Sequence, residues 1–303
     1  MLNPTFSILI TTKNRLEDLK QTLRELMVFI DNNEVEFIIC DDGSTDGTSN
    51  FIATKYKTIC LIKNNKSEGL IYSRNKLLAL TKAKYAITLD DDAHIVSKNS
   101  LEIIETFFKS HPKCAVMALR VFWGKTLPVN LNCNKASLRV QGFVGCGHVW
   151  RMEAWRDIPY YPDWFVFYGE EDFASYQLFK KGWNIVYNPN VLVHHRVDVK
   201  SRKKQKDYRL RLRRSLRSGW YLYFLFYPIN KIPKRLVYTF WQQIKKKTFK
   251  GDVKATIAIF QAMGDVVYNF PRLIKYANRL TNGEFKEYQK LPDTKLYWKP
   301  LES

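Results

Sequence analysis

The feature that most constrains the fold is the regular alternation of short apolar runs with helical patterns in the N-terminal part of the chain. Phe6–Thr11, Val35–Cys40 and Tyr85–Leu89 are rich in β-branched and apolar residues, as strands buried on both faces are. Between the first two runs, apolar residues recur at helical spacing from Leu16 to Ile30. This alternation predicts an α/β fold with a mainly parallel sheet flanked by helices. In such sheets, ligands bind beyond the carboxyl ends of the strands.

Positive charge is concentrated in one part of the chain. The 303 residues carry a net charge of +20, and the segment 200–250 alone holds 17 lysines and arginines with a single acid, a net +16. This shift predicts a globular domain over residues 1–199 and a basic, aromatic-rich helical extension over residues 200–303. Such a charge attracts anions, including nucleotides, nucleic acid and anionic lipid.

The cysteines and the apolar segments indicate a cytoplasmic protein. No CxxC pair is present, which argues against a zinc cage and favours free thiols in a reducing compartment. The five cysteines are Cys40, Cys60, Cys114, Cys133 and Cys146. The N-terminus reads as a strand rather than a signal peptide, and no uncharged apolar run reaches the roughly 18 residues that span a bilayer.

Two acidic clusters follow predicted strands. Asp90-Asp91-Asp92 comes directly after Tyr85–Leu89, and three adjacent carboxylates are hard to hold ionised without a cation. Their oxygen ligands suit Mg²⁺ or Mn²⁺, so the cluster predicts a metal site, with a solvated acidic turn as the alternative. Asp41-Asp42 follows the second strand, where turn formation is an equally simple explanation.

Three further positions are candidate site residues. Arg74 lies one turn into a predicted helix, and a guanidinium binds phosphate with two hydrogen bonds, although a surface arginine is the alternative. Glu170-Glu171-Asp172 follows an aromatic run, where partial desolvation would raise a carboxylate pKa toward that of a general base; helix capping is the alternative. Side chains alternate between the two faces of a strand, so His195 and His194 point to opposite faces. His195 is the better candidate for a metal ligand, and a structural role is the alternative.

The order of these motifs resembles that of family 2 glycosyltransferases with the GT-A fold, over residues 5–196. The motifs that carry the resemblance are Ser7–Arg15, Asp41–Asp46, Gly69–Asn75, Leu89–Ala93, Gly169–Asp172 and Val193–His195. The resemblance implies inverting transfer of a sugar from a nucleoside-diphosphate donor, of UDP or dTDP type, to an acceptor hydroxyl. It also implies a nucleotide-sugar half over residues 1–95, an acceptor half over residues 96–199, and a place in bacterial polysaccharide or lipid-linked glycan synthesis.

The resemblance assigns a donor pocket. Thr11 and Lys13 would line the nucleotide, and Asp42 would face the base with Asp41 beside it. Arg74 would lie near the diphosphate.

The resemblance also assigns a metal site with Mn²⁺ or Mg²⁺ as cofactor. Asp90, Asp91 and Asp92 would form the DXD-type motif, in which Asp91 touches the donor ribose or the metal and Asp92 ligates the metal. Asp90 is expected to serve both donor and metal, and His195 would complete the metal shell.

The position of the catalytic base depends on how the family's Glu-Asp pair is matched. Literal matching pairs it with Glu171-Asp172, whereas counting back from Gly182 pairs it with Glu170-Glu171 and puts Phe173 where a further acid is common. We predict Glu171 first and Asp172 second. For the acceptor wall, the resemblance implies Gly145 and Gly147, and Trp164 is predicted to stack on a sugar face, with core packing as the alternative.

The basic extension predicts a membrane contact through residues 200–250. Cations followed by the aromatic run from Trp220 to Tyr227 are typical of a helix lying on anionic lipid, with a helical cap on the domain as the alternative. This would place the protein at the inner face of the cell membrane, near a glycan or lipid-linked acceptor. Nucleic-acid binding is disfavoured because acidic clusters repel phosphates. A non-catalytic sugar-nucleotide module and a nucleotidyltransferase remain as alternatives.

Overall fold

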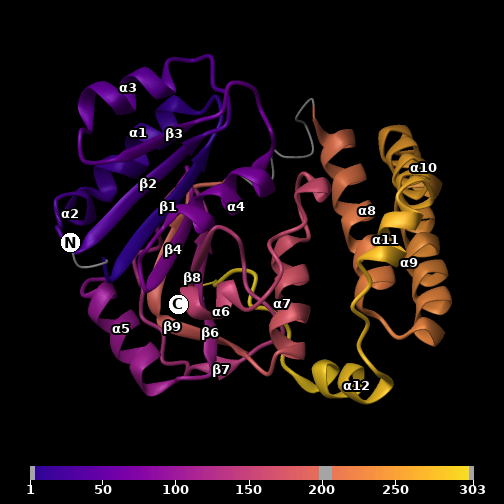
Figure 1. Ribbon diagram of the computed structural model, residues 1–303. Helices are drawn as coiled ribbons and strands as arrows, with labels where there is room; N and C mark the ends of the chain where they lie inside the picture. Colours follow the sequence, from indigo (N-terminus) through magenta and orange to yellow (C-terminus); the bar gives the residue numbers. More distant parts are fainter. Residues whose placement is uncertain (1–3, 198–206, 300–303) are drawn as a thin grey trace.

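The computed structural model describes residues 4–197 and 207–299 (Figure 1). The nine described strands form one sheet in the order β3-β2-β1-β4-β8-β6-β9-β5, and β7 pairs with β9. Their bounds are β1 Phe6–Thr12, β2 Val35–Asp41, β3 Cys60–Lys63, β4 Tyr85–Asp90, β5 Ala93–Ile95, β6 Cys114–Trp123, β7 Leu138–Arg139, β8 Gly147–Arg151 and β9 Asn184–His195.

The sheet is mixed, as predicted, and its parallel part corresponds to the strand–helix alternation of the sequence. β3, β2, β1 and β4 are all parallel neighbours, and β6 is parallel to β9. β8 runs antiparallel between β4 and β6, while β5 and β7 run antiparallel to β9. The sequence analysis did not predict β5, β7 and β8, because antiparallel strands need no helical crossover to reveal them.

Helices cover both faces of the sheet and continue into a C-terminal layer (Figure 1). The helices of residues 4–197 are α1 Leu16–Glu25, α2 Met27–Ile30, α3 Thr48–Lys55, α4 Leu70–Leu80, α5 Ser100–Ser110, α6 Met152–Arg156 and α7 Glu170–Lys180, with a 3-10 turn at Asp163–Phe165. The helices of residues 207–299 are α8 Tyr208–Phe226, α9 Ile232–Lys246, α10 Val253–Tyr268, α11 Phe270–Lys275 and α12 Asn282–Lys290, with 3-10 turns at Ile229–Lys231 and Thr248–Lys250.

Two hydrophobic clusters lie on opposite faces of the sheet. One packs the sheet against α1, α3 and α5, through side chains such as Leu23, Ile52 and Phe108. The other packs it against α4, α6 and α7 and extends without a break into α8, α10 and α12. The C-terminal helices therefore share a core with the sheet domain. The predicted boundary at residues 199/200 falls outside the described residues.

Three rings of the aromatic run of α8 are packed inside the protein. Trp220, Tyr221 and Phe226 are each no more than 2% exposed. Phe226 stacks on Tyr176 of α7 with ring centroids 4.8 Å apart, while Trp220 packs against Phe240 of α9 and Tyr221 against Phe165. Because these three rings lie in the core, they are not available to a membrane.

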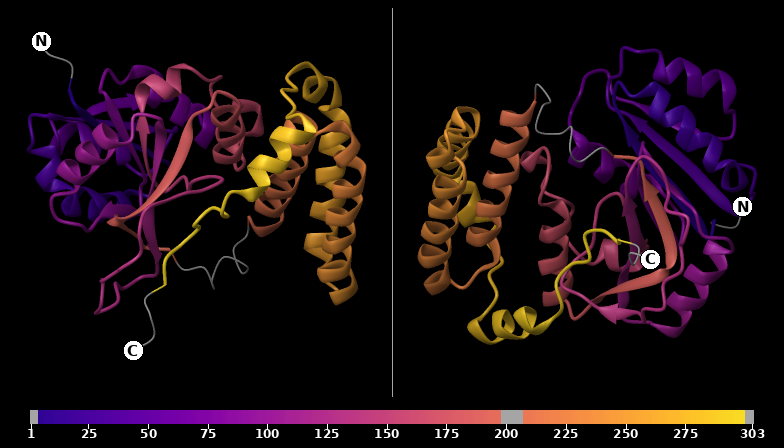
Figure 2. Two further views of the ribbon diagram at one scale, coloured as in Figure 1. Left: turned by 90° about the horizontal axis from the view of Figure 1, so that it is seen from below. Right: turned by 180° about the vertical axis from the view of Figure 1, so that it is seen from behind.

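The C-terminal segment after α12 runs back to the sheet domain (Figure 2). The backbone N–H of Gln141 donates to Pro292 O at 2.9 Å, and the N–H of Trp298 donates to Val121 O at 2.6 Å. The last described residues thus lie beside β6, close to the carboxyl edge of the sheet. Among the described helices, none is long and apolar enough to cross a membrane.

Candidate functional site

The sheet brings the predicted donor residues to one edge. In the parallel register, Thr12 lies opposite Asp41, and Thr11 lies opposite Asp90. The carboxyl ends of β1, β2 and β4 therefore meet there, where ligands of parallel sheets bind. Thr11 is buried, and Lys13 is exposed just beyond the end of β1. The predicted nucleotide contact of both residues stays a prediction.

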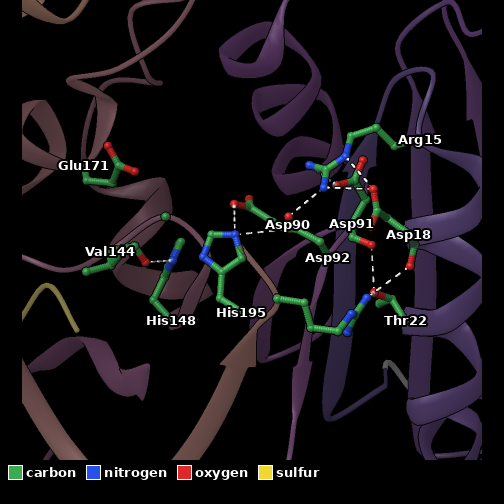
Figure 3. A network of polar contacts seen from close by, with 12 residues as sticks. Arg15, Asp18, Thr22, Asp90, Asp91, Asp92, Val144, His148, Glu171 and His195 are labelled. Atoms are coloured by element: carbon green, nitrogen blue, oxygen red, sulfur yellow. Dashed lines mark hydrogen bonds and ion pairs between the residues drawn. The ribbon is translucent and has the colours of Figure 1, made fainter. Parts of the chain in front are cut away.

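Each carboxylate of the Asp90–Asp92 run has a cationic partner (Figure 3). Arg74 donates to Asp90 at 2.8 Å, and Arg15 bridges Asp91 at 3.0 Å and Asp92 at 2.6 Å. The Thr12 hydroxyl also donates to Asp91 at 2.9 Å. These contacts answer the need for positive charge that the sequence analysis assigned to a metal alone.

Burial and ion pairing have opposite effects on the pKa values of the neighbouring carboxyls Asp91 and Asp92. Burial raises the pKa of Asp91 to about 7, although the charge of Arg15 opposes it. Burial also acts to raise the pKa of Asp92, but His195 and Arg15 outweigh it and hold that pKa well below its usual range. Asp92 is thus the carboxylate most firmly held in its charged form.

His195, and not His194, faces the acids, as the strand alternation predicted (Figure 3). Its Nε2 lies 2.9 Å from Asp92 Oδ1 and 3.9 Å from Asp90 Oδ2. Burial acts to lower the pKa of His195, but its hydrogen bonds to Asp92 and Cys146 raise it to about 11. His194 instead makes a hydrogen bond with Gly124 O at 2.7 Å, on the other face of β9.

The donor set fits a divalent metal ion. Ligand atoms of Asp90, Cys146 and His195 all lie within 4.8 Å of one another. The predicted metal residues Asp90 and His195 are thus brought together, and Asp92 contacts His195. Carboxylate, imidazole and thiol are all known ligand types for divalent ions. The sequence analysis did not count Cys146 as a ligand, because its position before β8 has no spacing relation to the acids.

Arg74 joins the Asp90–Asp92 run to the acids of α7. Its guanidinium, only 4% exposed, donates to Asp90 and also to Glu170 at 2.6 Å, and lies 3.6 Å from Glu171. It also donates to the carbonyl of Gly145 at 3.1 Å. The predicted contact with a diphosphate is therefore not what this geometry displays. Arg74 is occupied within the protein and fixes the two acidic clusters relative to each other.

The three acids of α7 have three different surroundings. Glu170 is buried, and burial raises its pKa to about 8. Glu171 is 23% exposed, and its carboxylate borders Gly145 and lies 3.6 Å from Arg74 Nη1. Asp172 is exposed, and its carboxylate lies near Gly142. Glu171 is therefore the acid of the three that contacts Arg74 and is also partly open to solvent.

The turn that precedes the three acids of α7 has unusual backbone angles. Val166 and Tyr168 have φ angles of 68° and 69°, which are uncommon for residues other than glycine. Gly169, at φ 89°, completes the turn immediately before α7. Such strain persists only where the surrounding structure enforces it, and it gathers at functional sites.

The carboxylate of Asp42 accepts five hydrogen bonds within the protein. It is 5% exposed and organises the loop that precedes α4. Its donors are Asn64 Nδ2 at 2.8 Å, Ser67 Oγ at 2.7 Å, the N–H groups of Glu68 and Gly69 at 2.9 and 3.0 Å, and Ser73 Oγ at 3.2 Å. Burial acts to raise the pKa of Asp42, but these hydrogen bonds lower it. Asp41 similarly accepts from the N–H of Ser44 at 2.9 Å. Base recognition by either residue stays a prediction.

The predicted acceptor residues do not form one surface. A Cβ at Gly145 would collide with Glu171 Oε1, so this glycine borders the acids of α7 directly. A Cβ at Gly147 would meet Val121 and Val193, so Gly147 serves packing within the sheet. Trp164 lies against Tyr221 of α8, with ring centroids 5.3 Å apart. Of the three, only Gly145 adjoins the acidic network.

Arg15 is the site residue that sequence reasoning missed. It was part of a quoted motif but had no assigned role. Its place directly after β1, at the edge where β4 also ends, was the available signal, because parallel neighbours end together. A second buried residue, His148, also lies beside Glu171 and His195 (Figure 3).

The fold is the GT-A fold, as comparison with solved structures shows. The structure of GalNAc-T7 with UDP, GalNAc and Mn²⁺ aligns with a TM-score of 0.60 at 13% identity, over 88% of this chain and 57% of that one. The mannosyltransferase PcManGT from Pyrobaculum calidifontis, in complex with GDP-Man and Mn²⁺, aligns with a TM-score of 0.51 at 13% identity, over 96% and 80%. S. aureus TarS 1–349 with UDP-GlcNAc gives 0.52 at 18% identity, over 72% and 66%. These likenesses establish the fold.

The sequence comparisons agree with the family resemblance. Residues 7–140 match the model of Glycosyl transferase family 2, and this part contains β1, β2 and β4 with the acids at their ends. The resemblance inferred from the motifs is therefore confirmed over this part of the chain. The Escherichia coli protein WfaP, a UDP-Glc:α-D-GlcNAc-diphosphoundecaprenol β-1,3-glucosyltransferase, is 35% identical over 104 residues. The match spans 33% of this chain and about two fifths, 41%, of that relative.

Proposed function

We propose that this protein is an inverting glycosyltransferase that moves a sugar from a nucleoside-diphosphate donor to an acceptor hydroxyl. The observation that carries the proposal is the position of Glu171. Its carboxylate lies 3.6 Å from Arg74, whose other nitrogen holds Asp90 at 2.8 Å. A candidate base and the candidate donor site are thus held on either side of one buried guanidinium.

In this arrangement Glu171 is the general base. It takes the proton of the acceptor hydroxyl as the oxygen forms a bond to the anomeric carbon. The bond from that carbon to the nucleoside diphosphate breaks at the same time, and attack from the opposite face inverts the configuration. Glu170 is a positioning residue, since it is buried and bound to Arg74. Asp172 faces the surroundings of Gly142 and is less well placed as the base.

The acidic run would bind the donor diphosphate with a divalent ion. Asp90, Asp92 and His195 are the family-type residues that would hold Mn²⁺ or Mg²⁺ here, and such an ion neutralises charge on the leaving diphosphate. Arg15 sits against Asp91 and Asp92 and fixes their carboxylates. Thr11 and Lys13 would line the nucleotide.

The relatives favour a UDP-sugar donor and a lipid-linked acceptor. WfaP uses UDP-Glc and a diphosphoundecaprenol-linked GlcNAc, and TarS is seen with UDP-GlcNAc. We therefore propose UDP-sugars ahead of dTDP-sugars, and a role in cell-surface glycan synthesis.

The test combines nucleotide binding with sugar transfer. Calorimetric titration of UDP and dTDP, with and without Mn²⁺, should show metal-dependent binding that Asp92→Ala loses and Glu171→Gln keeps. Transfer from UDP-glucose or UDP-GlcNAc to a GlcNAc-diphosphate lipid should fall by at least a hundredfold in both variants. Asp172→Asn is the matched control and should retain most activity.

Two outcomes would contradict the proposal. If Glu171→Gln transfers normally while Asp172→Asn is inactive, the base is Asp172. If UDP and dTDP bind with metal but no sugar is transferred from any donor, the chain is a non-catalytic sugar-nucleotide module.

We also propose that the protein binds an anionic membrane surface, through α9 and α10 rather than through α8. The exposed stripe of α9 contains Val237, Tyr238 and Trp241, which are 68%, 54% and 51% exposed. The stripe of α10 contains Val253, Ile257, Phe260 and Val267, at intervals of four, three and seven residues along the helix. These spacings put each set on one helical face.

The charge of the neighbouring residues supports lipid as the partner of this α9–α10 surface. The segment 228–251 has no acidic residue and carries Lys231, Lys234, Arg235, Lys245, Lys246, Lys247 and Lys250. Aromatic and apolar side chains beside such cations are the composition of an interfacial helix on anionic lipid. The two helices form the outer layer of the molecule, away from the sheet (Figure 1). The further cations at positions 200–206 lie outside the described residues.

Vesicle sedimentation tests this membrane contact. The protein should bind vesicles that contain phosphatidylglycerol and not vesicles of phosphatidylcholine alone, and salt should weaken the binding. Val237→Ser with Trp241→Ser should reduce binding at least tenfold. The control pair Val28→Ser with Tyr160→Ser removes exposed apolar side chains of the sheet domain and should change nothing. Equal loss in both pairs would contradict the α9–α10 surface.

A further inference from the structure

We propose that Cys146 is a protein ligand of the metal ion, and that this thiol makes the site prefer transition-metal ions such as Zn²⁺, Co²⁺ and Mn²⁺ over Mg²⁺. The inference deepens the proposed function and rests on it for the role of the ion. It goes beyond the predicted set of Asp90, Asp92 and His195, which contains no sulfur.

The geometry comes from three separate elements. Asp90 ends β4, Cys146 immediately precedes β8, and His195 ends β9. Their ligand atoms all lie within 4.8 Å of one another, which is the separation that ligands of one ion have. Cys146 and His195 are 3% and 5% exposed, while Asp90 remains partly open to solvent on the side where a donor would enter.

Two further observations distinguish the Cys146 thiol from that of an ordinary buried cysteine. Cys40 and Cys114 are equally buried, but among the described residues neither belongs to a group of three such ligands. The other ring nitrogen of His195 pairs with an acid, since Nε2 lies 2.9 Å from Asp92 Oδ1, whereas the buried Nδ1 has no hydrogen-bond partner. The imidazole in this group of ligands is therefore incompletely satisfied within the protein.

The ligand atoms of Asp90, Cys146 and His195 determine which metal ion binds most tightly. One carboxylate, one imidazole and one thiolate form a mixed O, N, S set, which suits Zn²⁺ and Co²⁺ far better than Mg²⁺, because Mg²⁺ demands oxygen ligands. On binding, the thiol loses its proton to water and the sulfur electron pair forms the bond to the ion. No oxidation or reduction is involved. The expected order of affinity is Zn²⁺ above Co²⁺, Co²⁺ above Mn²⁺, and Mg²⁺ last.

Cobalt spectroscopy tests the ligand directly. The starting protein is the Cys60→Ser, Cys133→Ser double variant, which removes the exposed and half-buried thiols. With Co²⁺ it should give visible bands from the bound ion and a near-ultraviolet band from the sulfur-to-cobalt bond. Adding Cys146→Ser should remove the near-ultraviolet band and weaken Co²⁺ binding at least tenfold. Adding Cys114→Ser instead removes a buried thiol elsewhere and should leave both features unchanged.

Every outcome decides the inference. Visible bands without the sulfur band in the starting protein would overturn it, whether or not Cys146→Ser folds, and so would an unchanged sulfur band in Cys146→Ser. Absence of Co²⁺ binding, or tighter binding of Mg²⁺ than of Mn²⁺ by calorimetry, would overturn it as well. If the sulfur band is present but no sugar is transferred, the proposed function fails while Cys146 stands as a ligand. If sugar is transferred but the sulfur band is absent, the proposed function stands and Cys146 is not a ligand.

Discussion

Arg15 and Arg74 hold each carboxylate of the Asp90–Asp92 run within 3.0 Å. Buried charges are costly unless paired, so these two arginines allow three adjacent acids to exist at the edge of the sheet. Arg74 extends the same pairing to Glu170. At the scale of single residues, the site is thus a continuous network of ion pairs from β1 to α7, and each member depends on close contact with the next.

Gly145 is required for that close contact. In Gly145→Ala the new methyl group would collide with Glu171 and lie 2.6 Å from Arg74 Nη1. These are the ends of flexible side chains, so we expect sugar transfer to fall at least tenfold while the free energy of unfolding changes by about 1 kcal/mol or less. Gly219→Ala in α8, where nothing lies within 4 Å of the new Cβ, is the control and should keep full activity. Kinetics and urea unfolding of both variants measure the difference.

His148 makes stability depend on pH. Burial, with the nearby charge of Arg74, lowers its pKa to about 3. In the folded state His148 stays neutral where the unfolded chain would protonate it. Stability is therefore lost as the pH falls below about 6.5, by up to about 1.4 kcal/mol per pH unit, until the pH reaches the folded pKa.

Urea unfolding at pH 4.5, 5.5 and 7 measures this effect. The advantage of wild type over His148→Gln in free energy of unfolding should shrink as the pH falls. The exposed His111 provides the control, because His111→Gln should follow wild type at each pH. An advantage that is constant over this range would show that His148 is not the titrating group.

At the scale of elements, the loop between β3 and α4 is organised by one carboxylate. Asp42, at the end of β2, accepts hydrogen bonds from five groups between Asn64 and Ser73. Several of these donors are buried backbone or side-chain groups that would otherwise lack a partner. Asp42 therefore joins β2 to the start of α4, the helix that carries Arg74.

Asp42→Ala should loosen this loop without unfolding the sheet. We expect the amides of Glu68 and Gly69 to exchange with solvent at least tenfold faster, because they lose their acceptor. Amides in the middle of β1 should be unaffected. Hydrogen exchange measures this, with the exposed Asp31→Ala as the control. Unchanged protection of the two amides would mean that the loop is held by other contacts.

At the scale of the whole molecule, the chain closes on itself through its C-terminal segment. Trp298 pairs with Phe122 of β6, and Arg120 lies over its ring at 4.6 Å. Its neighbour Tyr297 stacks on Trp123, and Trp123 in turn contacts the ring of His195. The segment after α12 therefore supports the end of β6 beside His195.

Trp298→Ala should destabilise the protein. Loss of a large, 92%-buried ring at this position should lower the free energy of unfolding by about 3 kcal/mol. Trp241→Ala, on the exposed stripe of α9, should change it by no more than about 0.5 kcal/mol. Urea unfolding compares the two. Equal effects would show that the C-terminal segment is not anchored on β6.

Much of the donor half could be predicted from local sequence, because parallel strands buried on both faces and the acids at their ends are continuous in the chain. The bounds of β1, β2 and β4 and the choice of His195 over His194 follow from apolar runs and period-two alternation. The antiparallel β8, with Cys146 just before it, could not be found this way, since its pairing with β4 and β6 depends on distant residues.

The sequence by itself determined the class of fold, the family resemblance and the edge of the sheet where the acidic clusters lie, because these depend on periodicity and on motif order. Only the tertiary structure decided which charges meet. It paired Arg15 with Asp91 and Asp92, turned Arg74 inward to Glu170, and stacked Phe226 of α8 on Tyr176 of α7. The physical reason is that ion pairs and core contacts form between residues far apart in the chain, and side-chain packing, rather than local propensity, selects among the available partners.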